Sequence, residues 1–195
     1  MVVQILSGKA DFGETSVMKK LVHTREISMR TSDLGDHYIL VEGNLIDHRY
    51  GAGRENASEE SEVVHHMVIQ LKVKGPRMLI EKAEATMPHH PREECPEMLP
   101  WMRHLEGLEI APGYSMKVKR AIGGIKGCAH LTSLVIAMGE SAVQGYWAAY
   151  GAEKDRTGIP EQTIKKFINT CHLWKEDGPI VKKLRESLES QNLSE

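Results

Sequence analysis

The chain has 195 residues, of which 41% are hydrophobic and 27% charged, and its formal net charge is −2 at neutral pH. A charge this close to zero gives no electrostatic reason to expect binding to nucleic acid or to an anionic membrane. No apolar run reaches the roughly 18 residues of a membrane span, and the N-terminus lacks the basic and apolar regions of a secretion signal. We therefore expect a cytoplasmic protein of ordinary globular composition.

The first part of the chain is expected to form an antiparallel hairpin behind an N-terminal arm. Residues 1–24 show no regular period and are assigned to the arm, so a single folded domain is expected over residues 25–195. Residues 25–30 alternate and residues 38–46 are rich in β-forming side chains, which predicts two paired strands. Residues 51–62 are polar and contain glycine, as is typical of a solvated loop.

Residues 63–74 carry the clearest strand pattern. The alternate side chains from position 65 to position 73 are His, Met, Ile, Leu and Val. Because successive side chains of a strand point to opposite faces, His65 is expected to point to the core with this apolar set. Residues 78–87 are predicted to form the partner strand.

The proline-rich residues 88–127 are predicted to be an irregular insert that packs over the sheet. Four of the eight prolines fall within its first thirteen residues, and Cys95 lies among them. A short helix is expected near residues 97–106, and a short strand over residues 115–122.

The last third of the chain is predicted to be helical. Apolar residues recur at helical spacing in one segment that begins at Cys128, in a second that ends at Cys171, and in a third after Pro179. Strands followed by helices predict an α+β fold, with an antiparallel sheet of about four to five strands and helices packed on one face.

Three residues with metal-binding chemistry are predicted to face this core, namely His65, Cys128 and Cys171. Cys128 is expected at a helix N-terminus, where the macrodipole favours the thiolate that ligates metals or attacks electrophiles. Imidazole and thiolate ligands together suit zinc or iron. We expect a zinc or iron site with these three ligands, and with His172 or an exogenous group as the fourth.

A different interpretation of the same residues stays open, because free cysteines are often buried simply as small apolar side chains. A direct pair between Cys128 and His130 is not expected, since residues two apart on a helix point about 200° away from each other. The adjacent His89 and His90 could join Cys95 in a second metal site, but exposed histidines of a proline-rich loop are the simpler interpretation.

Five motifs, YILVEGNLIDHR, HHMVIQLKV, MPHHPREEC, LEGLEIAPGY and above all GGIKGCAHLTSL, carry a resemblance to a known family. From about Arg25 to Gln144 the chain is similar to a bacterial family known only as a domain of unknown function. This resemblance implies no activity.

A more remote resemblance rests on VVHHMVIQLKV, KGCAHL and TCHLWKEDGPIVKKL, which are similar to segments of the NifU/IscU-type iron–sulfur scaffold proteins. It places His65 where that family has an aspartate, and it matches Cys128 and Cys171 to the helix-opening and last cysteines. Val63 stands in place of the first cysteine, and Thr170 in place of the histidine before the last one. The resemblance implies a NifU/IscU-like fold and a site for a metal or an iron–sulfur cluster.

The leading hypothesis is therefore a cytoplasmic metal-binding protein that resembles an iron–sulfur scaffold. It would hold or transfer a metal or sulfur species and bind a protein partner. A second hypothesis is a thiol-dependent transferase that uses Cys128 as its nucleophile, with His65 or His172 as the base. A third is a non-catalytic accessory subunit of a larger complex. These hypotheses leave open whether the protein is an enzyme and which oligomer it forms.

Overall fold

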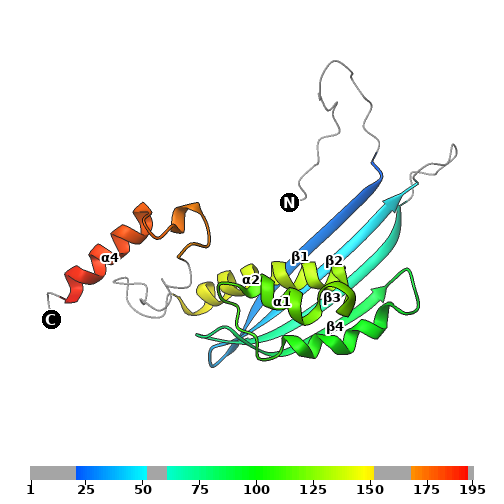
Figure 1. The fold of residues 1–195 in the computed structure, drawn as a ribbon, viewed down its shortest axis with the longest axis horizontal. Helices are drawn as coiled ribbons and strands as arrows, with labels where there is room; N and C mark the ends of the chain where they lie inside the picture. The colour runs from blue at the N-terminus through cyan, green and yellow to red at the C-terminus, as the bar shows by residue number, and fades with distance from the viewer. Residues whose placement is uncertain (1–20, 52–60, 152–167, 193–195) are drawn as a thin grey trace, which may run out of the picture.

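The structure of the protein is a computed structural model that describes residues 21–51, 61–151 and 168–192 (Figure 1). Four strands come first and the helices follow, which confirms the predicted α+β class. The elements in chain order are β1 (His23–Gly35), β2 (Tyr38–Tyr50), β3 (Ser61–Lys74), β4 (Leu79–His89), the 3₁₀ helix η1 (Cys95–Leu105), α1 (Tyr114–Ile122), η2 (Gly124–Lys126), α2 (Ala129–Tyr150), η3 (His172–Trp174) and α4 (Pro179–Asn192).

The four strands form one antiparallel sheet in the order β1-β2-β3-β4, so each strand pairs with its neighbour in the sequence. Figure 1 shows α2 lying across one face of this sheet, and it contacts β1, β2 and β3. The predicted hairpin and the predicted strand over residues 63–74 are therefore confirmed. The sheet has four strands, which lies within the predicted range.

The buried face of the sheet follows from the alternation of its strands. Ile39, Val41 and Leu45 of β2 are fully buried beneath the helices, and Asp47 continues the same row at its far end. Gly43 occupies the remaining place in the row, because a Cβ there would lie 2.6 Å from the Sδ atom of Met138 in α2. The missing side chain thus lets α2 approach the sheet closely.

α2 carries the apolar stripe that the sequence predicts. Leu131, Val135, Met138 and Ala142 are all buried against the sheet. Cys128 precedes the helix as its N-cap residue, with φ −110° and ψ 129°, and so has an extended rather than a helical backbone. Among the helices that the structure describes, none has the length and apolarity required to span a membrane.

The strand predicted over residues 115–122 is wrong, because this segment forms α1. Tyr114, Val118 and Ile122 recur every four residues and are buried together, a spacing that suits a helix face and not a strand. The predicted short helix near residues 97–106 corresponds to η1, which contacts β4.

The C-terminal part differs from the prediction around Cys171. The helix expected to end at this residue falls largely on residues outside the described ranges, but Cys171 itself lies in a turn before η3 and is exposed. Its predicted orientation toward the core is therefore wrong. The last predicted helix is confirmed as α4. Residues 1–20 of the expected arm lie outside the described residues, and β1 begins at His23.

Candidate functional site

Asp47 is the centre of the candidate site. Its side chain is only 2% exposed, since it ends the buried row of β2. Arg25 lies directly opposite on β1, and its guanidinium donates two hydrogen bonds of 2.7 Å, from Nε to Oδ1 and from Nη2 to Oδ2. This two-pronged contact holds the carboxylate in a fixed plane.

Two histidines from the neighbouring strands also reach Asp47. His65 faces it from β3, with Nδ1 3.0 Å from Oδ2, because the register pairs these two residues beside a β-bulge. His23 at the start of β1 places Nε2 3.5 Å from Oδ1. All three strands β1, β2 and β3 therefore contribute to the same end of the sheet.

The N-terminus of α2 adds a third imidazole. The ring centroids of His130 and His65 are 3.9 Å apart, and His130 Nε2 lies 3.7 Å from Oδ2 of Asp47. The other nitrogen of His130, Nδ1, lies 3.6 Å from Sγ of Cys128. The expectation that Cys128 and His130 do not meet is wrong, because the extended backbone of Cys128 removes it from the helical phase on which that expectation rested.

Hydrogen bonding, burial and neighbouring charges together set the protonation of Asp47 and His130. The hydrogen bond from Arg25 is the main reason that the pKa of Asp47 falls from 3.8 to about 2, although burial acts in the opposite direction. Burial and the charges of His65 and Arg25 lower the pKa of His130 against the opposing effect of Asp47. At neutral pH the site therefore combines an ionised carboxylate with a neutral His130 imidazole.

The arrangement offers the donor set of a metal site. Asp47, His65 and His130 each present one ligand atom, and these atoms all lie within 4.8 Å of one another. Oxygen and imidazole nitrogen ligands of this kind bind zinc and other divalent transition metals. His23 and Cys128 lie at the margin of the same cluster.

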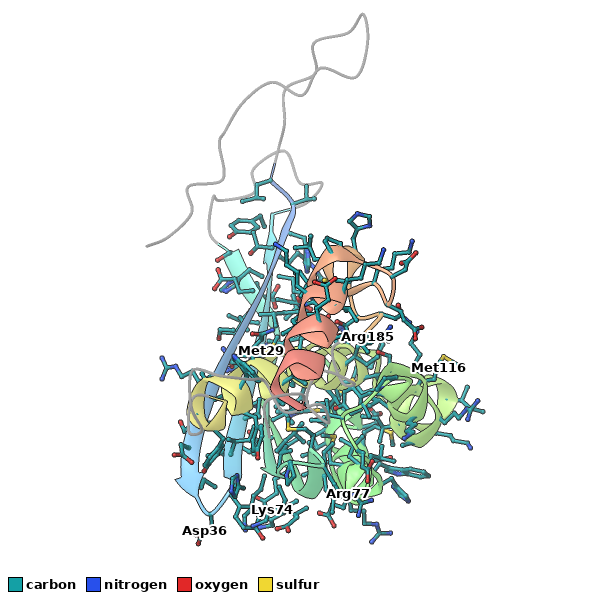
Figure 2. All side chains as sticks on the ribbon, turned by 90° about the vertical axis from the view of Figure 1, so that its left-hand side faces the viewer. Met29, Asp36, Lys74, Arg77, Met116 and Arg185 are labelled. Carbon is teal, nitrogen blue, oxygen red and sulfur yellow. The ribbon has the colours of Figure 1, made fainter. Side chains whose placement is uncertain are left out.

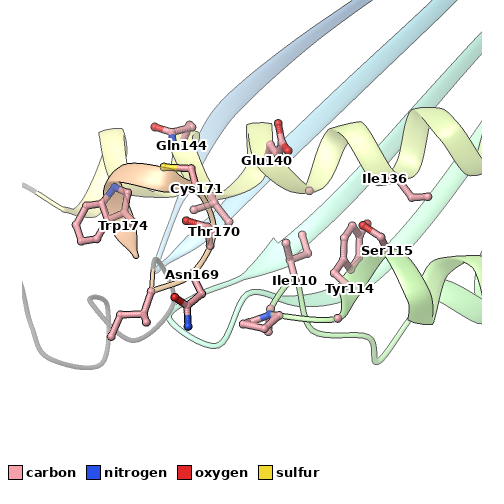
Figure 3. A pocket seen from close by; sticks show the side chains of 16 residues that line it. Ile110, Tyr114, Ser115, Ile136, Glu140, Gln144, Asn169, Thr170, Cys171 and Trp174 are labelled. Atoms are coloured by element: carbon pink, nitrogen blue, oxygen red, sulfur yellow. The ribbon is translucent and has the colours of Figure 1, made fainter. Parts of the chain in front are cut away.

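The four ligands predicted from the sequence do not meet at one point. His65 belongs to the cluster, and Cys128 reaches it through His130. Cys171 lines a separate cavity of about 740 Å³ with Gln144 and Trp174, and His172 follows it in η3 (Figure 3). Because α2 rises about 1.5 Å per residue, the part of α2 that lines this cavity, from Ile136 to Gln144, lies about 9–21 Å along the helix from His130.

Sequence reasoning missed three members of the cluster, namely Asp47, Arg25 and His130. Asp47 carries a recognisable signal, since a carboxylate ends an alternating apolar row on a strand that is otherwise buried. His130 lies within the GCAHL motif, but helical geometry alone predicts that it points away from Cys128. Arg25 has no local signal, because only the strand register brings it opposite Asp47.

Comparisons with known proteins agree with part of the sequence interpretation. No curated protein and no solved structure shows significant similarity to the chain, so none supports a NifU/IscU-like fold. One family profile matches residues 23–144, a span that begins at His23 and includes Cys128 and His130. The chain therefore belongs to the family described as a protein of unknown function (DUF2889).

Proposed function

We propose that the protein binds one divalent transition-metal ion, zinc or iron(II), through Asp47, His65 and His130. The observation that carries this proposal is the spacing around Asp47 Oδ2, which lies 3.0 Å from His65 Nδ1 and 3.7 Å from His130 Nε2. In a tetrahedral site with bonds of about 2.0–2.1 Å, neighbouring ligand atoms are about 3.4 Å apart. The two distances bracket this value.

The carboxylate of Asp47 can accept a metal without losing Arg25. A carboxylate offers about four lone-pair positions, and Arg25 occupies two of them. The contact from His65 uses a third, so a metal ion would replace the hydrogen that now lies between His65 and Asp47. Arg25 then acts as a positioning residue that keeps the carboxylate plane in place.

Cys128 would support the metal indirectly. If Nε2 of His130 ligates the ion, Nδ1 carries the ring hydrogen and can donate it to the sulfur 3.6 Å away. Metal-bound histidines commonly donate their second nitrogen in this way, which orients the ring and fixes its tautomer. Three protein ligands leave at least one coordination position open, as in sites where the metal is reactive or is passed on.

The geometry favours a mononuclear ion over an iron–sulfur cluster. Cluster scaffolds hold iron mainly through several cysteine thiolates. Cys128 is the one cysteine for which a hydrogen-bonding contact with the cluster is found within the described residues, and Cys171 lines a separate cavity. The proposed role is therefore to hold or transfer a single metal ion, or to use it as a Lewis acid at the open position.

Metal analysis of single variants tests the proposal. We expect the anaerobically purified chain to bind one zinc or iron(II) per molecule, and His65→Ala and His130→Ala to lose this binding. His66→Ala is the matched control, because His66 follows His65 on β3 but hydrogen-bonds Asn44, at 2.8 Å. Unchanged stoichiometry in both cluster variants, with folding verified by circular dichroism, would overturn the proposal.

A second candidate function is thiol chemistry at Cys128, favoured by its 3.6 Å contact with His130. Cys128 lies at the N-terminus of a 22-residue helix, and His130 is a neutral base with Asp47 on its other side. This arrangement would serve acyl or sulfur transfer, with His130 as the base in place of His65 or His172.

Alkylation of metal-free protein separates the two candidates. For a thiol enzyme, iodoacetamide should modify Cys128 faster than the exposed Cys171 at neutral pH, and His130→Ala should remove this advantage. A Cys128 that reacts more slowly than Cys171, with or without His130, would leave only the metal function.

A further inference from the structure

The two edges of the sheet differ in what covers them. The outer edge of β4 bonds to the segment that follows η1, with Ile80 N donating to Leu108 O at 2.9 Å and Ile110 N donating to Met78 O at 2.9 Å. β1 forms the other edge and runs along the outside of the sheet (Figures 1 and 2). Within the described residues, no backbone segment pairs with its outer side.

The backbone of β1 presents regular hydrogen-bonding groups at this edge. Tyr50 N donates to Val22 O at 3.1 Å, which shows that the backbone N–H and C=O groups of Val22 point toward β2. This direction alternates along an antiparallel strand. The backbone N–H and C=O groups that point outward, away from β2, are therefore those of Arg25, Ile27, Met29 and Thr31. A long exposed edge of this kind is a template for pairing with another strand.

The side chains of β1 in one copy of the chain are complementary to those of β1 in a second copy. If two copies pair antiparallel with Ser28 on the twofold axis, Glu26 of each copy lies opposite Arg30 of the other. In the same register Ile27 lies opposite Met29. Opposite charges and apolar pairs directly across a strand pair are stabilising. We propose that two copies of this chain associate through β1 in this register and form a continuous eight-stranded sheet.

The exposure of side chains on β1 supports a second copy of the chain as the partner that covers this edge. Ile27 is 42% exposed, although it pairs with the fully buried Leu45 of β2 on the helix-covered side. Met29 of the second copy would cover it. No ion pair involving Glu26 or Arg30 is found within the described part of the chain, so both charges are available to the partner.

Other registers match less well. Centring the pair on Glu26 or on Arg30 places like charges opposite each other, which is destabilising. Centring it on Ile27 leaves Glu26 and Arg30 opposite uncharged residues, and so does centring it on Met29. The Met29 register does pair Arg25 with Asp33, but these side chains already bond Asp47 and Tyr150 within their own chain.

The proposed dimer would bring the second copy next to the candidate metal site. His23 and Arg25 both belong to β1, and the register with Ser28 on the axis places Asp33 of the second copy opposite His23. The dimer is nevertheless independent of the metal, because its pairing uses none of Asp47, His65 and His130.

Charge reversal tests the proposal with the full chain. In sedimentation equilibrium we expect the wild type to dimerise, and Glu26→Arg and Arg30→Glu each to raise the dissociation constant about tenfold or more. An equimolar mixture of the two variants should dimerise again, because arginines at 26 and 30 of one chain then face glutamates of the other. A wild type that stays monomeric at 100 µM, or a mixture that stays monomeric, would overturn the proposal.

Disulfide trapping tests the register. In a Cys171→Ser background, Ser28→Cys should give a covalent dimer under mild oxidation, since directly opposed residues lie about 4.5–5.5 Å apart and suit a disulfide. Ser32→Cys on the same face is the matched control, because it would lie opposite Thr24 and should not cross-link. Equal cross-linking of both variants would contradict the register.

Hydrogen exchange of the outward β1 amides tests whether this edge is free in the monomer. Protection of these amides in a monomer would show that the chain covers its own edge, which also overturns the proposal.

Discussion

The imidazole of His130 lies between Cys128 and Asp47, with Nδ1 3.6 Å from the sulfur and Nε2 3.7 Å from the carboxylate oxygen Oδ2. The helix layer supplies the thiol and the imidazole, and the sheet supplies the carboxylate. The side chain of His130 therefore connects the N-terminus of α2 to the end of the buried row of β2, and the chemistry of the site depends on this contact.

Removing the thiol should separate the supporting role of Cys128 from a ligand role. We expect Cys128→Ala to keep one metal per chain but to bind it about tenfold more weakly, because His130 loses the partner of its second nitrogen. A competition titration against a chromophoric chelator measures the change. Complete loss of binding in Cys128→Ala would instead identify the sulfur as a ligand, and Cys95→Ala controls for the loss of a partly buried thiol.

The stability of the metal-free protein should fall in acid because of Asp47. Its pKa in the folded protein is about 2, below the ordinary value of 3.8, so folding favours the ionised form. The corresponding stabilisation of about 2 kcal/mol is present above pH 4 and is lost as the pH falls toward 2.

Urea unfolding in the presence of EDTA, repeated between pH 5 and pH 2, measures this loss. Asp47→Asn should be less stable at pH 5 and should show a flatter dependence on pH. Asp36→Asn, which removes a carboxylate from the exposed β1–β2 turn, should keep the slope of the wild type. Identical slopes for Asp47→Asn and the wild type would contradict the expectation.

Adding a methyl group at Gly43 should push α2 away from the sheet. The new Cβ would lie 2.6 Å from Sδ and 2.9 Å from Cγ of Met138, which is fully buried. We expect Gly43→Ala to destabilise the fold by about 1–3 kcal/mol, as overpacking of a core does. Met138→Ala opens space at the same point, so the double variant should be more stable than the sum of the single effects predicts. Additive effects in thermal unfolding would show that the two residues do not share this contact.

The buried hydroxyl of Tyr114 should contribute to the attachment of α1. It donates to the backbone oxygen of Val135 in α2 at 3.1 Å. Tyr114→Phe keeps the ring against Gly139 and removes only this bond, so we expect a loss of about 1 kcal/mol in the free energy of unfolding. Tyr38→Phe removes an exposed hydroxyl that bonds Glu81 and should change stability by less. A loss in Tyr38→Phe as large as that in Tyr114→Phe would contradict this ranking.

Local periodicity was enough to predict the strands, the buried stripe of α2 and the α+β class. Alternation over residues 63–74 and three- and four-residue steps after Cys128 each depend only on neighbours within one element. The same reasoning failed where two periods overlap, as in α1, whose residues from Tyr114 to Ile122 alternate over a short stretch and also recur every four.

Only part of the candidate site could be predicted from the sequence, for the same physical reason. The alternation of strand residues decides toward which face of the sheet His65 points, and the start of the helix decides where Cys128 lies. Both are local properties of the sequence. Which side chains meet on that side depends on strand register, which sets Arg25 and His65 opposite Asp47. It also depends on where α2 begins over the sheet, which brings His130 to the same carboxylate, while Cys171 lies near Gln144, farther along the helix (Figure 3). Register and helix placement arise from packing between elements far apart in the chain, so only the tertiary structure could decide them.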